Sequence, residues 1–382
     1  MATRAEYCEG DFWPSQGKPL STTVQVPEYL SRYRQVLAYG LGFKDGRLDG
    51  AVRIPADFTS VTSRRLFRPW DGEGKGGWTQ SLNSPGSSDE VLAEGGFSFS
   101  GIGEEGLDGL TGPQKIVFYM PELPTEKGWR NVLEKVRSGQ VKQLVVAAPA
   151  LREVVTTQFR RRSMREVFPE WSVMGESPWS TSGDRPVAGP RYRLEGGETV
   201  ASVAGQPTVV RKQIGQGWVY CLLFDPALSE NAALAAETYR SLLAGCGVAP
   251  HWGADSGVMV RLYQGQKGIL IAGVQSDDVR SWKGTKGTSG GFRPYQISAS
   301  RKARVFLTPN QAYAVLALPS GTREQKTADA DGTLSFMLNH VSHEVFFILP
   351  ADRAAELDAI ASRKAIFDRA MTLDGLAGPP TP

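Results

Sequence analysis

The chain has 382 residues, of which 41% are hydrophobic and 22% are charged, and its formal net charge is +3. This length predicts two or three domains, each with a core of its own. The longest basic run is the triplet Arg160 to Arg162. We interpret this triplet as a solvated helix face, so the charge pattern argues against nucleic acid as the main partner.

Three cysteines, Cys8, Cys221 and Cys246, are too few and too scattered for a disulfide framework or a zinc site. The first ten residues lack the basic region followed by an apolar region that marks a secretory signal. No window reaches membrane-spanning length without charges. The sequence therefore predicts a cytoplasmic protein with no membrane segment, no metal and no cofactor.

Residues 1–112 combine few regular elements with a long polar stretch. The spacing of apolar residues predicts a helix over 27–39 that begins at Pro27, and a short strand over 51–54. Residues 59–112 are rich in Gly and Ser and are predicted to form a loop.

The pattern changes at Lys115, where KIVFYMPELP predicts a buried strand that ends in a proline-bounded turn. A helix over 126–137, capped by Thr125 and ended by Gly139, leads to a second buried strand over 143–148. This strand–helix–strand order predicts a parallel pair joined by a right-handed crossover.

Further along, residues 163–168 predict a helical turn and residues 171–197 an irregular segment. A hairpin over 199–211 precedes a Gly-rich turn, a strand over 218–224 and a helix over 231–243. These elements complete one α/β domain.

After Pro250 the hydrophobic period becomes two. Strands over 258–263 and 268–274 form a predicted hairpin, and residues 276–294 a long loop. Regularly spaced runs then predict an all-β sandwich, which a helix over 352–371 closes. The runs lie at 304–307, 312–318, 333–338 and 344–349.

The order of these parts resembles that of large glycoside hydrolases of the beta-galactosidase type. KIVFYMPELP with VLEKVRSGQVKQLVVAAPALRE, and later IGQGWVYCLLFDPALS with YRSLLAGCGVAP, look like their class I glutamine-amidotransferase-like trimerisation domain. The resemblance implies an α/β fold with an amidotransferase-like (flavodoxin-like) central domain over 113–275. It places a small β-sandwich with a C-terminal helix over 276–382. Residues 1–112 are then an N-terminal loop-rich segment, within which 5–57 resemble the last helix and strand of a catalytic (β/α) barrel.

An active glutamine amidotransferase needs a cysteine on a tight strand-to-helix turn, activated by a histidine. The G-x-C-x-G turn is absent, Cys246 follows a helix, and His251 has no visible acidic partner. We therefore expect a degenerate domain. A third possibility, a cysteine-dependent amidotransferase, requires a reactive thiol.

The segment from His340 to Glu344 has histidines three residues apart. On a strand, His340 and His343 point to opposite faces, whereas a zinc pair needs helical spacing of four. We expect structural roles for both.

Glycoside hydrolysis needs two carboxylates across the scissile bond, and barrel enzymes carry them at the carboxyl ends of strands. Glu9 and Asp11, and Asp57 after the strand over 51–54, occupy such places if the barrel resemblance holds. Asp225 ends the strand over 218–224 in the same way. Glu9 and Asp57 are the predicted catalytic pair, although acidic residues at strand ends also act as turn formers.

Four tryptophans lie among polar, Gly-rich or Pro-rich neighbours, where an aromatic ring favours stacking on a sugar. The alternative is that these tryptophans pack long loops against a domain. The predicted saccharide-binding residues are Trp13, Trp70, Trp78 and Trp179. The acidic residues Glu73, Glu104, Glu105 and Asp108 are interpreted as a solvated face.

These observations favour a carbohydrate-active protein related to glycoside hydrolases that hydrolyses or binds a poly- or oligosaccharide. The alternative is a non-catalytic oligomerisation or interaction module that partners a separate catalytic chain. The predicted partners are therefore a saccharide and either further copies of this chain or a catalytic chain, without nucleic acid or membrane.

Overall fold

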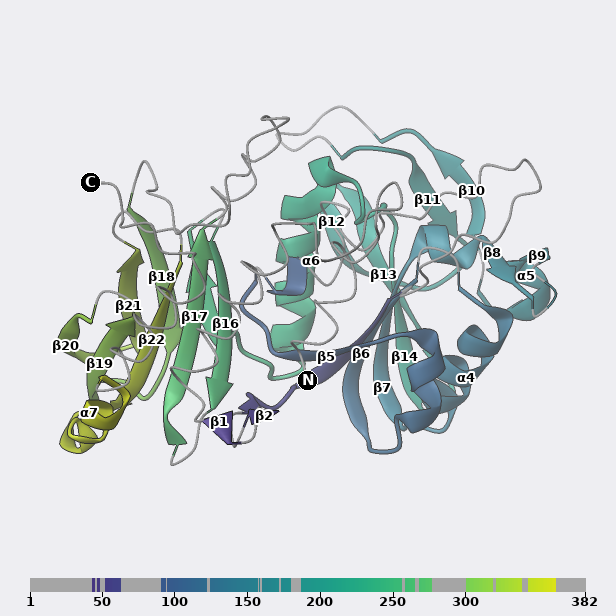
Figure 1. Cartoon of the computed structure of the whole chain (residues 1–382). Helices are drawn as coiled ribbons and strands as arrows, with labels where there is room; N and C mark the ends of the chain where they lie inside the picture. The colour runs from purple at the N-terminus through teal and green to yellow at the C-terminus, as the bar shows by residue number, and fades with distance from the viewer. Residues whose placement is uncertain are drawn as a thin grey trace, which may run out of the picture. The chain divides into compact units, whose positions relative to one another are not determined.

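The computed structural model describes about two-thirds of the chain, and this part divides into two compact units. One, the α/β unit, is Pro55–Pro250, and the other, the β-rich unit, comprises Met1–Ile54 and His251–Pro382 (Figure 1). The described residues are 43–44, 47–48, 52–62, 91–93, 95–121, 124–156, 158, 160–171, 173–179, 187–255, 258–264, 268–276, 300–318, 321–338 and 343–361.

The α/β unit is built on a seven-stranded sheet in the order β12-β13-β14-β7-β6-β4-β5. The five strands from β14 to β5 pair in parallel, whereas β12, β13 and β14 pair antiparallel. Their bounds are β4 (Phe58–Thr62), β5 (Phe99–Ile102), β6 (Gln114–Met120), β7 (Val141–Ala147), β12 (Glu198–Val203), β13 (Gln206–Ile214) and β14 (Gly217–Leu222). The predicted α/β class is thereby confirmed.

Two helices cover opposite faces of this sheet, α4 (Glu126–Arg137) and α6 (Ala232–Gly245) (Figure 1). Alternate residues of a strand point to opposite faces. Val117 and Tyr119 of β6 accordingly share a buried cluster with Trp129 of α4. Ile116 and Phe118 share another with Tyr239 of α6. The near-continuous apolar run of β6 is therefore explained by burial on both faces.

Local signals set the limits of α4. The Thr125 Oγ1 accepts a hydrogen bond from the Gly128 backbone N–H at 2.9 Å, which caps the first turn. At the other end Gly139 has a φ of +77°, a conformation that favours glycine. Both features confirm the predicted start and end of this helix, and the pairing of β6 with β7 confirms the predicted parallel strand pair.

Between β7 and β12 the chain leaves the sheet and forms two antiparallel hairpins. The 3-10 helix η4 (Ala148–Leu151) leads into β8 (Glu153–Val155) and β9 (Arg161–Ser163), followed by the short helix α5 (Met164–Val167). Strands β10 (Val173–Ser177) and β11 (Arg191–Leu194) form the second hairpin. These hairpins carry the candidate site.

The β-rich unit contains a six-stranded and a three-stranded sheet, both antiparallel, and their inner faces share one apolar core. Strand orders are β20-β19-β22-β17-β16-β3 and β15-β18-β21. Helix α7 (Glu356–Ala361) packs its Leu357 and Ile360 against a second cluster with β19 and β22. The strand bounds are β3 (Val52–Arg53), β15 (Trp252–Ala254), β16 (Val258–Gln264), β17 (Leu270–Ser276), β18 (Arg301–Phe306), β19 (Ala312–Leu318), β20 (Arg323–Thr327), β21 (Thr333–Leu338) and β22 (His343–Pro350).

Several predicted elements match the structure. The hairpin over 199–211, the strand over 218–224, the helix over 231–243 and the helical turn over 163–168 all appear within a few residues. So do the hairpin after Pro250 and the four predicted strands that follow it. The helix over 27–39 and the loop over 276–294 lie largely or wholly outside the described residues.

Three predictions are corrected. The loop predicted over 59–112 contains β4, β5 and the 3-10 helix η3 (Glu104–Gly109), because short strands with few apolar residues lack a clear period. The segment 171–197 contains β10 and β11. The arginine triplet lies at and in β9 rather than on a helix.

The limits of the compact units also differ from the predicted domain limits. Contacts place β4 and β5 with the α/β unit, which begins at Pro55 rather than at residue 113. Likewise β16 and β17 belong to the β-rich unit, which resumes at His251 rather than at residue 276.

Candidate functional site

An open, strongly charged cleft of about 470 Å³ lies on the two hairpins of the α/β unit. This volume falls within the range of about 300–1,000 Å³ that small-molecule sites occupy. The lining residues are Arg152, Glu153, Arg161, Arg162, Ser163, Val173, Met174, Gly175 and Glu176.

Apolar anchors hold the cleft in place. Val154, Met164 and Phe168 are fully buried in the same cluster as Trp129 of α4. The Val155 backbone N–H also donates to the Pro124 carbonyl oxygen at 2.9 Å, which ties β8 to the start of α4. In β8, Val154 and Val155 are buried, whereas Glu153 is only half-buried and lines the cleft.

The cleft is reached from the carboxyl ends of two parallel strands. Strand β7 ends at Ala147 and leads through η4 to Arg152, and β6 leads to the first turn of α4. In open α/β sheets ligands bind outside the carboxyl ends of the strands. The position of the cleft agrees with this rule.

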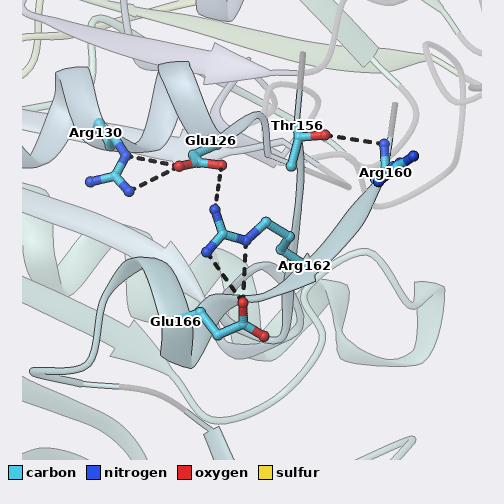
Figure 2. Close-up of polar contacts among 6 residues, drawn as sticks. All are labelled: Glu126, Arg130, Thr156, Arg160, Arg162 and Glu166. Atoms are coloured by element: carbon cyan, nitrogen blue, oxygen red, sulfur yellow. Dashed lines mark hydrogen bonds and ion pairs between the residues drawn. The ribbon is translucent and has the colours of Figure 1, made fainter. Parts of the chain in front are cut away.

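Figure 2 shows a chain of ion pairs that includes Arg162, one of the residues that line the cleft. Arg162 lies between two carboxylates: its Nη1 is 3.3 Å from Glu126 Oε2 and its Nε is 3.2 Å from Glu166 Oε2. Glu126 Oε1 also accepts from Arg130 Nη2 at 2.9 Å. Glu126 is the most buried of these charged groups, with its side chain 21% exposed. This network fixes Arg162 and connects α4, β9 and α5.

Two further ion pairs join residues that line the cleft. Arg152 Nη1 lies 2.9 Å from Glu176 Oε1, and Arg161 Nη1 lies 3.4 Å from Glu153 Oε2. Both arginine side chains are more than half exposed. Exposed pairs of this kind contribute about 0–1 kcal/mol each to stability. A ligand with its own charged or hydroxyl groups therefore competes with them at little cost.

Tyr192 of β11 lies behind the Arg152–Glu176 pair. Burial raises the pKa of its phenol, and the negative charges of Asp225 and Glu176 raise this pKa further, while Arg152 opposes them. The phenol therefore stays protonated at neutral pH.

A second charged contact lies at the carboxyl end of β6 and joins residues of the α/β unit to one another. The Glu104 carboxylate accepts hydrogen bonds from the Tyr119 hydroxyl and, at 2.9 Å, from the Thr125 backbone N–H. It therefore lies at the N-terminus of α4, where negative charge is stabilised. The prediction of a solvated face is wrong for Glu104, although Glu105 and Asp108 are exposed.

Two of the predicted site residues lie in the described part of the chain. Asp57 is exposed between β3 and β4, and its backbone N–H donates to the Ser98 carbonyl oxygen at 3.0 Å. Trp179 is half-buried against the α6 side of the sheet, with the Arg191 guanidinium 6.0 Å from its ring centroid. The other predicted site residues lie outside the described residues; they are Glu9, Trp13, Trp70 and Trp78. The catalytic and saccharide-binding roles of all six residues stay predictions.

Asp225 has a local role. Its Oδ1 accepts a hydrogen bond from the Ala227 backbone N–H at 2.9 Å, which makes it a turn former at the end of β14. Within the described ranges no group of three His, Cys, Asp or Glu side chains is placed to hold a metal ion. No helix there is long and apolar enough to cross a membrane.

The two described thiols are poorly suited to nucleophilic catalysis. Cys221 is fully buried in β14, and burial raises its pKa. Cys246 follows α6, and burial raises its pKa too, against the opposing charge of Lys115. A catalytic thiol needs a lowered pKa.

We therefore expect slow alkylation of both thiols. In a Cys8→Ser background at about pH 7.5, iodoacetamide should label Cys246 and Cys221 at least about tenfold more slowly than free cysteine, because little thiolate forms. Mass spectrometry of the folded protein measures this rate. Labelling of Cys246 at the rate of the free amino acid would revive the amidotransferase hypothesis.

No protein-family model and no curated protein match this chain. Solved structures that are similar to it include Gan42B, a GH42 beta-galactosidase from G. stearothermophilus, with 13% identity and a TM-score of 0.46 over 77% of this chain and 40% of that one. A beta-galactosidase from Bacillus circulans sp. alkalophilus has 12% identity and a TM-score of 0.44, over 76% and 42%. Alpha-L-fucosidase isoenzyme 2 from Paenibacillus thiaminolyticus has 14% identity and a TM-score of 0.44, over 78% and 49%. The chain thus spans less than half the length of these glycoside hydrolases.

Proposed function

We propose that this chain is a carbohydrate-active protein related to glycoside hydrolases, and that it binds an oligo- or polysaccharide in the cleft on β8, β9 and β10. The observation that carries the proposal is the lining of that cleft. It offers guanidinium donors, carboxylate acceptors and an exposed apolar side chain, Met174, within one open volume. Saccharides present hydroxyl groups and apolar C–H faces together, so they need this mixture.

The state of the carboxylates favours binding over catalysis at this cleft. Glycoside hydrolysis needs one carboxylic acid with a raised pKa. Glu153 and Glu176 are each paired with an arginine. A neighbouring guanidinium favours the charged form of a carboxylate, whereas a general acid must hold a proton.

A blocking substitution tests the location. Ser163 is exposed and lines the cleft, so Ser163→Trp should fill the cleft without disturbing the core. The matched control is Ser241→Trp, at an exposed position of α6. Calorimetric titration with a panel of oligosaccharides should find a ligand that Ser163→Trp binds at least about tenfold more weakly than Ser241→Trp does. This difference corresponds to about 1.4 kcal/mol of binding free energy. Equal affinity of both variants for every bound sugar would overturn this location.

For hydrolysis, Glu9 and Asp57 remain our proposed carboxylate pair, with Trp13, Trp70, Trp78 and Trp179 as stacking residues. A screen with nitrophenyl glycosides tests this. Turnover that disappears in Glu9→Gln or Asp57→Asn would support a hydrolase. Binding without turnover would support the alternative of a module that serves a separate catalytic chain, and light scattering would then show whether the chain self-associates. A cytoplasmic location also stays a prediction.

A further inference from the structure

Each arginine that lines the cleft is already matched by a carboxylate. Arg152 pairs with Glu176, and Arg161 pairs with Glu153, within the lining itself. Arg162, the third lining arginine, pairs with two carboxylates of neighbouring elements. The positive charge of the lining is therefore balanced before any ligand enters the cleft.

The pairs Arg152–Glu176 and Arg161–Glu153 each place a hydrogen-bond donor beside an acceptor. The N–O distances are 2.9 Å and 3.4 Å, and each of the four side chains is at least 37% exposed. A guanidinium has several N–H groups and a carboxylate accepts through both oxygens, so each pair can bind further groups without separating. The second oxygens of Glu153 and Glu176 accept no hydrogen bond from the described residues.

Adjacent hydroxyl groups of a sugar fit such a pair. A hydroxyl group both donates and accepts, so one hydroxyl can accept from the guanidinium while its neighbour donates to the carboxylate. Both hydrogen bonds involve a charged group, which strengthens them. A ligand carboxylate fits less well because it only accepts. It would have to take the arginine from Glu153 or Glu176 and leave that glutamate unpaired beside it.

We propose that the cleft selects neutral saccharides with adjacent free hydroxyl groups, and that Glu153 and Glu176 exclude acidic ones. The two glutamates are then specificity-determining residues, since each supplies an acceptor to a neutral ligand and repels a negative one. This inference rests on the proposed saccharide-binding function and names its ligand class.

Neutral and acidic sugars of equal length test this preference on the full chain. One pair is a galacto-oligosaccharide and an oligogalacturonide, and the other is a manno-oligosaccharide and an oligomannuronide. At about 50 mM salt, the neutral sugar of at least one pair should bind at least about tenfold more tightly than its acidic partner. At about 500 mM salt this difference should shrink, because screening weakens the repulsion. The permethylated neutral sugar cannot donate to a carboxylate and should not bind.

Substitution of the glutamates separates repulsion from a structural role. Glu153→Gln and Glu176→Gln should each strengthen binding of the acidic sugar about fivefold, because a negative charge is removed. Each should weaken binding of the neutral partner about twofold, because a charged acceptor is lost. A damaged hairpin would instead weaken binding of both sugars. Glu237→Gln, at an exposed position of α6, should change neither affinity.

The possible outcomes distinguish the two proposals. Equal binding of the two sugars in each pair, still weakened by Ser163→Trp, would overturn the exclusion of acidic sugars and keep the saccharide function. Glutamine variants that bind the acidic sugar no better than the unmodified chain would have the same consequence. Binding of no sugar from either pair would count against both proposals.

Discussion

Gly215→Ala is expected to destabilise the α/β unit by about 3 kcal/mol, more than a typical single substitution. Gly215 and Gln216 form the two-residue turn between β13 and β14, and Gly215 has a φ of +62°. An added Cβ atom would lie 2.6 Å from both Cα and the carbonyl oxygen of Arg137. The backbone conformation costs about 1–2 kcal/mol for alanine, and displacing the end of α4 adds a similar amount.

Gly205→Ala is the matched control for this prediction. Gly205 lies in the two-residue turn between β12 and β13 and has a similar φ of +75°, but an added Cβ atom would meet nothing within 4 Å. It should cost about 1 kcal/mol. Urea denaturation, monitored by tryptophan fluorescence, measures the free energy of unfolding of both variants. Equal losses in the two variants would show that the contact with Arg137 contributes nothing.

Glu104→Ala is expected to cost about 2–3 kcal/mol, because it removes both a hydrogen-bond acceptor and a negative charge. The Tyr119 hydroxyl loses its hydrogen bond to the carboxylate, and a hydrogen bond to a charged group contributes about 1.5–3 kcal/mol. The N-terminus of α4 loses a negative charge, worth about 0.3–1 kcal/mol. Glu105→Ala, at the exposed neighbouring residue, should change the free energy of unfolding by less than about 0.5 kcal/mol.

Gly128→Ala tests the contact between Glu104 and the first turn of α4. A Cβ atom at Gly128 would lie 2.5 Å from Glu104 Oε1, so the carboxylate would have to move away. If the account is right, adding Gly128→Ala to Glu104→Ala should cost much less than Gly128→Ala costs alone. Additive losses in this double-mutant cycle would contradict it.

The parts of the fold that the sequence predicts are those with strong local signals. Helix α4 has a capping threonine, an amphipathic pattern and a terminal glycine, and it appears where expected. Strands β6, β7 and β14 are apolar runs bounded by turns. Each signal lies within the element that it specifies.

The missed elements depend on distant partners. Strand β4 contains Thr59 and Ser60, both buried, which a sequence pattern assigns to a loop. They are buried because β5 and β6 pair on either side. Tertiary pairing here overrides a weak local preference.

The cleft was missed for a related reason. Its charged residues come from separate hairpins, and each charge alone is typical of a solvated surface. In both segments, REVV and RRRSM, the charged residues are followed closely by a buried apolar residue, Val154 or Met164, which anchors the segment to the core. Pairing of these segments becomes apparent only in three dimensions.

The most direct test of the account is hydrogen exchange of the full chain with and without a saturating oligosaccharide ligand. We predict slower amide exchange in peptides covering residues 152–177, and no comparable change in peptides covering α6, because the ligand orders the two hairpins. Protection confined to other parts of the chain would contradict a saccharide site on these hairpins.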